Sequence, residues 1–300
     1  MNPLVSIMIA TYNQPNYIVQ AVQSCLNQDY ENIEVVVGDD STNDDVYTAL
    51  LPLLNNPKVK YFRNEKNLGR VKNYKKLLFD YAKGDWAMML DGDDYYLDNT
   101  YLSKAVKWIN DNDNVVLVAA GFLKSDENTG IETKEILTEE DKIFDGKEMF
   151  YLQMKIGQHS TNIYNRKLAL ELDFYRIESM GTDSEGLFRI ALHGNVVYLN
   201  DIVVLWRIHQ VNNTFKPEDA IKQMKEMFFI DNVYHYAIKF IGQVEAKKWR
   251  FNMYHSMSYH ISTLAENSKN KFTILRVSFW ASKYWGFLNT LRYMKRVLIK

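Results

Sequence analysis

The first hundred residues alternate between short apolar runs and longer segments with helical periodicity. Continuous apolar runs, which are typical of strands buried on both faces, lie at 4–10, 33–38, 59–62 and 86–90. Apolar positions at helical spacing predict helices over 16–28, 44–54 and 71–82. Strands that alternate with helices in this way indicate an α/β fold with a mostly parallel sheet flanked by helices.

After residue 123 the pattern is less regular. The segment 124–147 is polar and predicts a surface excursion, and 203–206 is apolar enough for one more strand. Beyond Pro217 the chain becomes helical, with a stripe of Met and aromatic residues that indicates either core packing or a homodimer contact. A helical C-terminal extension is therefore expected after the α/β region.

The composition indicates the class of the protein and the compartment in which it folds. With 47% hydrophobic and 24% charged residues, 300 residues can bury a sizeable core. The single cysteine, Cys25, cannot form an internal disulfide, and the N-terminus lacks a signal-peptide pattern, so a reducing cytosol is expected. No apolar run approaches the roughly 18 residues of a membrane-spanning helix, so no such helix is expected.

Polar residues collect where the predicted strands end. They are Thr11, Tyr12 and Asn13 after the first strand, Asp39 and Asp40 after the second, and Asp91, Asp93 and Asp94 after the fourth. Open α/β sheets bind ligands at the carboxyl ends of their strands, so these residues are expected to share one crevice. The sequence contains neither G-x-G-x-x-G after the first strand nor a Walker loop, which excludes those two ways of holding phosphates.

The cluster Asp91-Gly92-Asp93-Asp94 offers another way to hold them. Carboxylate oxygens bind Mg²⁺ or Mn²⁺ and leave coordination positions open for a diphosphate. An isolated D-G-D is more often a solvated turn that closes a hairpin. Here an apolar strand runs directly into the cluster and two other strand ends carry acids or amides, which favours the metal and diphosphate site.

These motifs resemble the family 2 glycosyltransferases of the GT-A (Rossmann-like) fold over roughly residues 4–209. The resemblance implies that Asp40 hydrogen-bonds the nucleotide base, that Asp91 lies near the ribose and that Asp93 binds Mn²⁺ or Mg²⁺. It also implies a nucleotide-sugar site, for which the matching residues are Thr11, Tyr12, Asn13, Asn67, Gly69 and Gly92. After Gly69 the sequence departs from the frequent family pattern, and Lys72 and Asn73 are the weaker candidates for donor contacts. Alternatively, the solvent-exposed face of a helix carries the cations of this segment, which are Arg70, Lys72, Lys75 and Lys76.

Inverting transfer also needs a general base outside the metal cluster. The segment Gly181-Thr182-Asp183-Ser184-Glu185 precedes a helical apolar pattern, and the resemblance implies that Asp183 is the base. Asp183 is equally suited to cap the helix, and the two roles are compatible. Thr182 and Glu185 are candidates for acceptor contacts.

Two histidines belong to the candidate site on different grounds. Arg207-Ile208-His209 resembles the R-x-H that follows the last core strand of the family, where the histidine completes the metal or diphosphate site. His159 lies in a strand-like stretch that either lines the acceptor pocket or is a plain edge strand.

The resemblance gives a domain division and a function. It predicts a catalytic domain at 1–215, with a donor half of about 1–123 and an acceptor half of about 145–215, followed by a helical region at 216–300. UDP-sugars are the expected donors, and a growing surface glycan on a lipid carrier is the expected acceptor. A sugar nucleotidylyltransferase and a non-catalytic carbohydrate-binding protein are the alternatives, but the first lacks its glycine-rich basic loop here and the second needs neither metal cluster nor base.

Charge sets the C-terminal tail apart from the body. From Asn267 onward there are eight basic residues and no acidic one, so the remaining 28 basic and 37 acidic residues give the body about −9. Aromatic residues interleave with these cations, as in helices that lie on an anionic membrane surface. The tail therefore predicts peripheral association with the inner face of the cell membrane, and the alternative is a helix packed on the catalytic domain. Nucleic acid is not an expected partner, because the body is acidic and has no recognisable base-stacking module.

Overall fold

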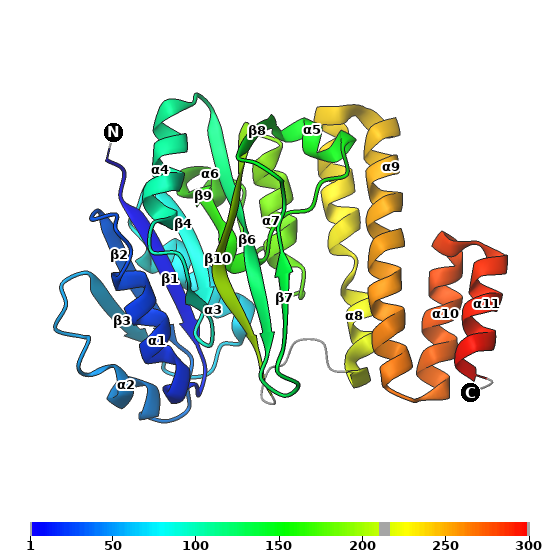
Figure 1. The fold of residues 1–300 in the computed structure, drawn as a ribbon, viewed down its shortest axis with the longest axis horizontal. Coiled ribbons are helices and arrows are strands. Elements are labelled where there is room, and N and C mark those ends of the chain that lie inside the picture. Colours follow the sequence, from blue (N-terminus) through cyan, green and yellow to red (C-terminus); the bar gives the residue numbers. More distant parts are fainter. Residues whose placement is uncertain (1, 210–216, 299–300) are drawn as a thin grey trace. The chain divides into compact units, whose positions relative to one another are not determined.

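The chain was analysed as a computed structural model that describes residues 2–209 and 217–298, and it divides into two compact units (Figure 1). Unit 1 comprises residues 1–149, 155–178 and 182–210. Unit 2 comprises residues 150–154, 179–181 and 211–300.

Unit 1 is built on a mixed sheet, which has ten strands within the described residues. The strands are β1 (Val5–Thr11), β2 (Ile33–Asp39), β3 (Val59–Arg63), β4 (Trp86–Asp91), β5 (Tyr95–Tyr96), β6 (Val115–Asp126), β7 (Ile131–Glu135), β8 (Lys142–Asp145), β9 (Asn162–Asn165) and β10 (Asn195–Ile208). Their order is β3-β2-β1-β4-β9-β6-β10-β5, with β7 paired to β6 and β8 paired to β10. The pairs among β3, β2, β1 and β4 are parallel, as is β6 with β10, whereas β9 is antiparallel to both of its neighbours.

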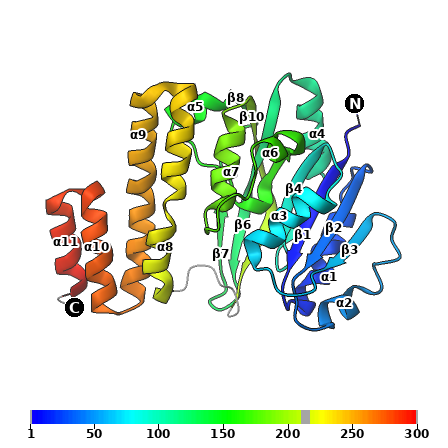
Figure 2. The same ribbon diagram turned by 180° about the vertical axis from the view of Figure 1, so that it is seen from behind.

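The helices of unit 1 cover both faces of this sheet. They are α1 (Pro15–Leu26), α2 (Asp45–Leu50), α3 (Arg70–Lys76), α4 (Tyr101–Asp111), α5 (Gly146–Tyr151), α6 (Arg166–Glu171) and α7 (Thr182–Ala191), with short π and 3₁₀ turns at η1 (Leu77–Tyr81) and η2 (His159–Thr161). Helices α1, α2 and α4 lie on one face (Figure 1), and α3, α6 and α7 lie on the other (Figure 2). Strands β1 and β2 are buried along nearly their whole length because their residues are apolar on both faces.

The α/β class predicted from the sequence is confirmed. The parallel half of the sheet is the part that the apolar runs predicted, whereas the antiparallel strands β7 and β8 lie in the segment that the polar composition assigned to a surface excursion. Strand β7 has four exposed residues out of five, so it carries no apolar alternation that the sequence could have revealed.

Unit 2 is helical, as expected for the C-terminal extension. It contains η3 (Pro217–Asp219), α8 (Ala220–Glu226), α9 (Phe229–Asn267), α10 (Lys271–Trp285) and α11 (Phe287–Leu298). The chain reverses direction inside α9 at Gly242, where φ is 75° and ψ is 163°, and again between α10 and α11 at Gly286. Side chains with a Cβ rarely adopt this positive φ, which explains glycine at both reversals.

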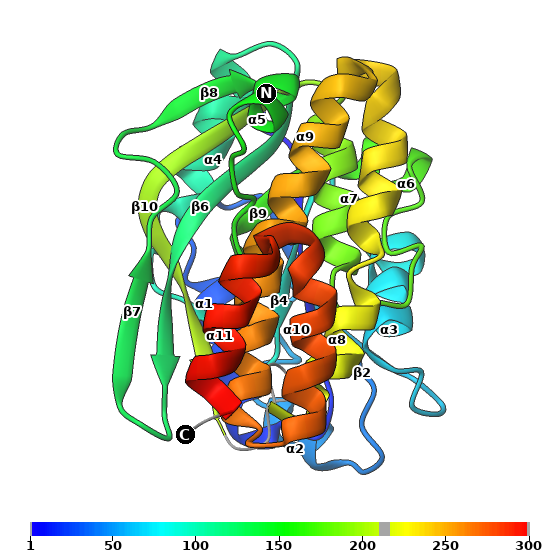
Figure 3. The same cartoon turned by 90° about the vertical axis from the view of Figure 1, so that its right-hand side faces the viewer.

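Helices α10 and α11 pack side by side with the second part of α9 (Figure 3). The indole of Trp285 donates a hydrogen bond to Ser258 Oγ at 2.7 Å, and the rings of Tyr254 and Tyr284 stack with centroids 4.9 Å apart. Within the described ranges, no helix combines the length and the apolar character needed to cross a bilayer.

Candidate active site

Three strand ends of unit 1 meet at one edge of the sheet. In the parallel register Thr11 lies opposite Asp39, and Ala10 lies opposite Asp91. A Cβ on Gly92 would lie 2.9 Å from Thr11 Cβ, so only glycine lets the turn after β4 approach β1 this closely. The strand-end residues of the predicted crevice therefore lie side by side.

Asp40 holds the turn that precedes α3. Its Oδ1 accepts hydrogen bonds from Leu68 N at 2.8 Å and Asn64 Nδ2 at 3.0 Å, and its Oδ2 accepts one from Gly69 N at 2.9 Å. Asn67 Oδ1 also accepts a hydrogen bond from Gly69 N, and Gly69 has a φ of 83°. The predicted nucleotide residues Asp40, Asn67 and Gly69 are thus brought together, and backbone N–H groups fix the Asp40 carboxylate.

Asn13 and Tyr12 extend the same edge. Asn13, with a φ of 53°, receives a hydrogen bond on its Oδ1 from Thr42 N and donates its own N–H to Ser41 Oγ. The Tyr12 side chain is 45% exposed, so its ring is accessible at the crevice edge. Thr11, in contrast, is buried at the end of β1.

Lys72 and Asn73 do not lie together in the crevice. Asn73 is buried, donates to the Gly38 carbonyl at 2.8 Å and accepts from Asn64 Nδ2 at 3.0 Å, so its amide connects α3 to β2 and to the residue that follows β3. These bonds give the Asn73 side chain a structural role, and its contact with the donor stays a prediction. Lys72 is exposed and pairs with Glu178 at 2.9 Å, on the wet face of α3.

The acidic cluster after β4 is held from β10. Asp93 Oδ2 lies 3.0 Å from His209 Nε2, and the Arg207 guanidinium donates to the Asp93 carbonyl at 2.6 Å. The backbone N–H of Arg207 donates to Asp94 Oδ1 at 2.9 Å. Two segments more than a hundred residues apart thus form one cluster, and the role of His209 in a metal or diphosphate site stays a prediction.

Burial changes the electrostatics of these acids. Removal from water, and then the charge of Asp91, raise the pKa of the Asp93 carboxyl, which the hydrogen bond from His209 partly opposes. Burial, followed by the charges of Asp93 and Asp91, raises the pKa of Asp94 well above its usual range. Acids crowded in this way favour a cation, because a positive charge would relieve their mutual repulsion.

The donor atoms of the cluster fit a divalent ion. Asp93 offers a carboxylate and His209 an imidazole, and Asp94 Oδ2 is buried without a hydrogen-bond partner among the described residues. Over the same residues, no three His, Cys, Asp or Glu side chains gather as a complete ligand set. The protein atoms therefore suit an ion that also takes ligands from a bound substrate.

Arg207 is a part of the site whose importance the sequence did not reveal. Besides Asp93 and Asp94, it bonds Gln20 Oε1 at 2.9 Å and Glu127 Oε1 at 2.9 Å, and its guanidinium lies 4.6 Å from the centre of the Tyr17 ring. Tyr17 in turn stacks on His209 with ring centroids 4.8 Å apart. Because Arg207 lies in β10 and His209 directly follows it, the end of one strand orients the whole cluster.

Asp91 connects this cluster to a second group of residues. The Tyr74 hydroxyl donates to Asp91 Oδ1, and the Tyr74 ring lies 5.2 Å from the ring of His159 and 5.4 Å from that of Tyr175. His159 Nε2 and Tyr175 Oη are 2.8 Å apart. We call these three residues, Tyr74, His159 and Tyr175, the Tyr–His cluster.

Asp183 lies in the first turn of α7, and its charge acts on the residues of the Tyr–His cluster. Burial raises the pKa of Tyr74 well above its usual range, and the charges of Asp91 and Asp183 add to this shift, which Arg70 opposes. The same two carboxylates act on the His159 ring. The charges of Asp183 and Asp91 therefore act on the same two side chains, Tyr74 and His159. Arg70 acts on them too, and its guanidinium is 5.9 Å from the Tyr74 ring.

The predicted acceptor residues are buried. Glu185 is 0% exposed and forms ion pairs with Arg176 at 2.5 Å and Arg189 at 2.8 Å, which give it a structural role, and its contact with the acceptor stays a prediction. Thr182 is also buried, and its Oγ1 has no hydrogen-bond partner among the described residues. His159 is buried within the Tyr–His cluster, where removal from water lowers its pKa.

Comparison with known sequences identifies relatives of this architecture. The profile of Glycosyl transferase family 2 matches residues 6–172, which is more than half of the chain. The GalNAc(5)-diNAcBac-PP-undecaprenol beta-1,3-glucosyltransferase of Campylobacter jejuni is 30% identical over 107 residues, which cover 34% of this chain and 35% of that relative. Across the first curated relatives, the chain spans 14% to 59% of the relative's own length.

Solved structures agree on the fold. Staphylococcus aureus TarS in complex with UDP has a TM-score of 0.64 at 18% identity and covers 84% of this chain and 71% of its own. The mannosyltransferase PcManGT of Pyrobaculum calidifontis, in complex with GDP-Man and Mn²⁺, has a TM-score of 0.60 at 16% identity and covers 98% of this chain and 79% of its own. These likenesses confirm the expected GT-A fold. With the family profile running from β1 through α6, the chain belongs to glycosyl transferase family 2.

Proposed function

We propose that this chain is an inverting glycosyltransferase, which moves a sugar from a UDP-sugar to an acceptor hydroxyl and uses Asp183 as general base. The observation that supports the proposal is that the charges of Asp91 and Asp183 both act on the Tyr–His cluster. In the proposed complex the acidic cluster holds the donor, and Asp183 is the separate carboxylate that serves its reacting carbon. Asp183 has no hydrogen-bond or ion-pair partner among the described residues, which leaves its oxygens available to a substrate.

In the proposed reaction, the acceptor oxygen forms a bond to the anomeric carbon of the donor while the bond from that carbon to the diphosphate oxygen breaks. Asp183 takes the proton of the acceptor hydroxyl. The nucleoside diphosphate leaves with the bonding electron pair, and the configuration at the anomeric carbon inverts. An α-linked donor therefore gives a β-linked product.

Asp93 and His209 would hold a divalent ion, Mn²⁺ or Mg²⁺, on the donor diphosphate. When bound, such an ion would neutralise charge that develops on the leaving group. The Arg207 side chain keeps the acidic turn in place by its bond to the Asp93 carbonyl. The Mn²⁺ in the PcManGT complex supports this assignment, and the UDP in the TarS complex supports the choice of donor.

The decisive experiment compares the native chain with Asp183→Asn. We expect UDP affinity, measured by calorimetry with Mn²⁺, to be unchanged, and turnover of the preferred UDP-sugar to fall at least about 10²-fold, as for a lost general base. Asp113→Asn, at an exposed acid on the loop before β6, is the control and should match the native chain. Loss of UDP binding in Asp183→Asn would mark Asp183 as a donor or structural residue instead.

We also propose that the acceptor is a glycan on a lipid carrier and that the enzyme works on the cytoplasmic face of the membrane. The Campylobacter relative, whose name includes undecaprenol, supports the lipid-linked acceptor. The surface of α10 supports the location. Phe272, Leu275 and Phe279 are 66%, 44% and 76% exposed, and their spacing puts them on one helix face beside the exposed cations Lys271, Arg276 and Lys283.

Only part of the tail follows the expectation of a membrane-facing aromatic surface. Trp285 and Tyr293 are buried, and Tyr284 stacks on Tyr254, as in the alternative of a packed helix. The exposed apolar stripe is therefore narrower than the sequence suggested. A truncation after Glu266 would remove these packed residues together with the exposed stripe. Point substitutions on the stripe therefore test the membrane contact more directly.

We expect Phe272→Ser with Phe279→Ser to reduce co-sedimentation with vesicles that contain anionic lipid, because two large apolar side chains would no longer enter the headgroup region. High salt should weaken binding of the native chain, since each cation near the surface contributes about 1 kcal/mol. Val244→Ser, at a 69% exposed position of α9, is the matched control. Equal sedimentation of all variants would reject the α10 surface as the contact.

A further inference from the structure

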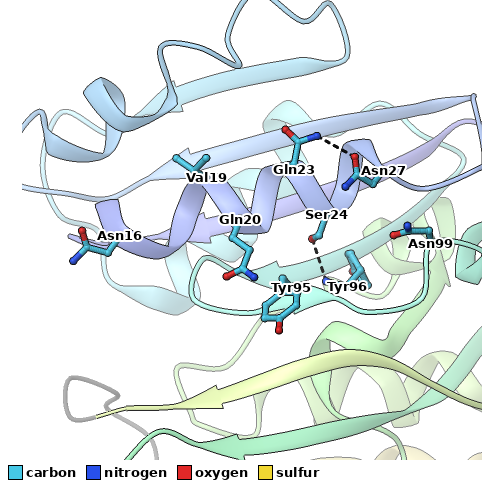
Figure 4. Close-up of a pocket in the computed structure, with 9 residues that line it drawn as sticks. All are labelled: Asn16, Val19, Gln20, Gln23, Ser24, Asn27, Tyr95, Tyr96 and Asn99. Atoms are coloured by element: carbon cyan, nitrogen blue, oxygen red, sulfur yellow. Dashed lines mark hydrogen bonds between the residues drawn. The ribbon is translucent and has the colours of Figure 1, made fainter.

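A groove of about 500 Å³ runs between α1 and β5 in unit 1 (Figure 4). Its size is within the range of small-ligand sites, roughly 300 to 1,000 Å³. The side chains that line it come from α1, from β5 and from the turn before α4, and they are Asn16, Val19, Gln20, Gln23, Ser24, Asn27, Tyr95, Tyr96 and Asn99. Neither Asp183 nor the Tyr–His cluster contributes to it.

The chemistry of this lining is uniform. Five of the nine side chains are carboxamides, three carry hydroxyls and one is valine, and none of these described lining residues is charged. A phosphate or nucleotide would need cations, and a cationic ligand would need carboxylates. A carboxamide presents a donor and an acceptor side by side, which matches the hydroxyls of a neutral sugar, since each of these both donates and accepts.

The amides are placed to meet a ligand. Asn16, Gln20, Gln23, Asn27 and Asn99 are all exposed. Gln23 Nε2 donates to Asn27 Oδ1 at 3.0 Å, which orients the pair, while Gln23 Oε1 and Asn27 Nδ2 have no partner among the described residues. The half-buried Tyr95 ring faces Gln20 across the groove and offers a flat amphipathic surface (Figure 4).

The walls of the groove are fixed to each other. Ser24 Oγ donates to the Ala21 carbonyl and accepts from Tyr96 N at 3.0 Å, which ties α1 to β5. The buried Gln28 amide donates to the Asp98 carbonyl and accepts from Leu102 N, which anchors the turn that carries Asn99. A rigid lining reduces the entropy lost when a ligand binds.

One end of the groove contacts the residue that braces the acidic cluster. Gln20 Oε1 accepts from Arg207 Nη2, and the Tyr95 ring centre lies 5.3 Å from the Arg207 guanidinium. Arg207 also donates to the Asp93 carbonyl. A ligand at this end would therefore lie behind the donor site and touch its support.

From these observations we propose that the α1–β5 groove is a second saccharide-binding site, which takes a neutral stretch of a glycan outside the crevice. The proposal rests on the proposed function only for its class of ligand. The nine lining residues are uncharged, although Arg207 contacts Gln20 and Tyr95 at one end, and the amides and the Tyr95 ring provide the contacts that a neutral sugar needs.

The test is saturation-transfer NMR with neutral disaccharides, such as lactose, cellobiose, maltose and diacetylchitobiose, while saturating UDP with Mn²⁺ occupies the crevice. We expect at least one disaccharide to bind under these conditions. The double variant Gln23→Ala with Asn27→Ala should weaken it roughly tenfold, because each lost hydrogen bond accounts for a factor of a few. Asn55→Ala removes an exposed amide outside the groove and should leave binding unchanged.

Absence of binding by every disaccharide, or equal binding by the double variant, would overturn the proposal. A double variant that changes oligomeric state in sedimentation velocity would overturn it too, because the groove would then be an interface between copies. Calorimetry with UDP on each variant keeps the two ideas apart. Failure to bind UDP would count against the proposed donor site, whereas disaccharide binding alone decides the groove.

Discussion

Two groups of carboxylates act on the Tyr–His cluster, and they are held in different ways. In the first group, Asp91 accepts a hydrogen bond from Tyr74, and Asp93 is buried beside His209 with its carbonyl bound by Arg207. The second is Asp183, which is half-buried at the start of α7 and has no hydrogen-bond partner among the described residues.

This difference matches two chemical tasks. A group that holds a charged diphosphate works best when it is fixed before the ligand arrives, since no reorganisation is then needed during the reaction. A general base must exchange a proton with the substrate, so protein contacts to its oxygens would compete with that exchange. The proposed roles therefore require a preorganised Asp93 and an Asp183 whose oxygens are available to the substrate.

The largest expected effect comes from disrupting the first group of carboxylates. Asp93→Ala removes a ligand of the proposed ion, so charge on the leaving diphosphate would be uncompensated and turnover should fall about 10³-fold. Stimulation by Mn²⁺ over a chelated sample should disappear as well. Asp113→Ala, at an exposed loop acid, is the control, and full activity of Asp93→Ala with chelator present would refute the metal assignment.

The sequence predicted the parts of the site that depend on continuous patterns. Apolar runs located β1, β2 and β4, and the polar residues at their ends converge as expected because parallel strands end at one edge. The pairing of Asp93 with His209 followed only from the family motif, since nothing local connects β4 to β10.

Polar residues that become buried were the parts that the sequence could not place. Asn73 and Glu185 occur in segments with ordinary helical periodicity, yet their partners, Gly38 and Arg176, come from other elements. The tail shows the same limit, because only the packing of α9 decides that Trp285 is buried while Phe279 remains exposed. Periodicity finds a helix, but burial of a polar or aromatic residue depends on tertiary partners.

Two ion pairs near α7 sharpen the distinction between structural and exposed acids. Glu185→Gln would leave the buried Arg189 charge incompletely compensated, and we expect the free energy of unfolding to fall by about 3 kcal/mol. Glu178→Gln is the matched control, because its pair with Lys72 is exposed and should contribute less than about 1 kcal/mol.

Urea unfolding of both variants gives the comparison, and UDP affinity should remain unchanged in each. If Glu185→Gln unfolds at the native midpoint and raises only the KM for the acceptor, Glu185 contacts the acceptor and the structural assignment is wrong.

The smallest effect concerns pH and His159, on which the charges of both Asp91 and Asp183 act. Burial lowers the pKa of His159, and the nearby Arg70 lowers it further, while the carboxylates of Asp183 and Asp91 partly oppose the shift. The folded state therefore holds His159 neutral at a pH at which the unfolded chain already binds a proton. Stability from this residue is present above its ordinary pKa of about 6.5 and is lost as the pH falls toward the lower folded value. The loss cannot exceed about 1.4 kcal/mol per pH unit for one group.

We expect His159→Gln, which keeps a polar side chain near Tyr175 but does not titrate, to flatten the decrease in unfolding free energy between pH 7 and pH 5. His193→Gln is the control, because the pKa of His193 is also lowered but its side chain is exposed. Its substitution should therefore change the pH dependence of the unfolding free energy less than His159→Gln does. Parallel pH profiles for the native chain and His159→Gln would show that the ring is not held neutral, and the two carboxylates would then dominate its surroundings.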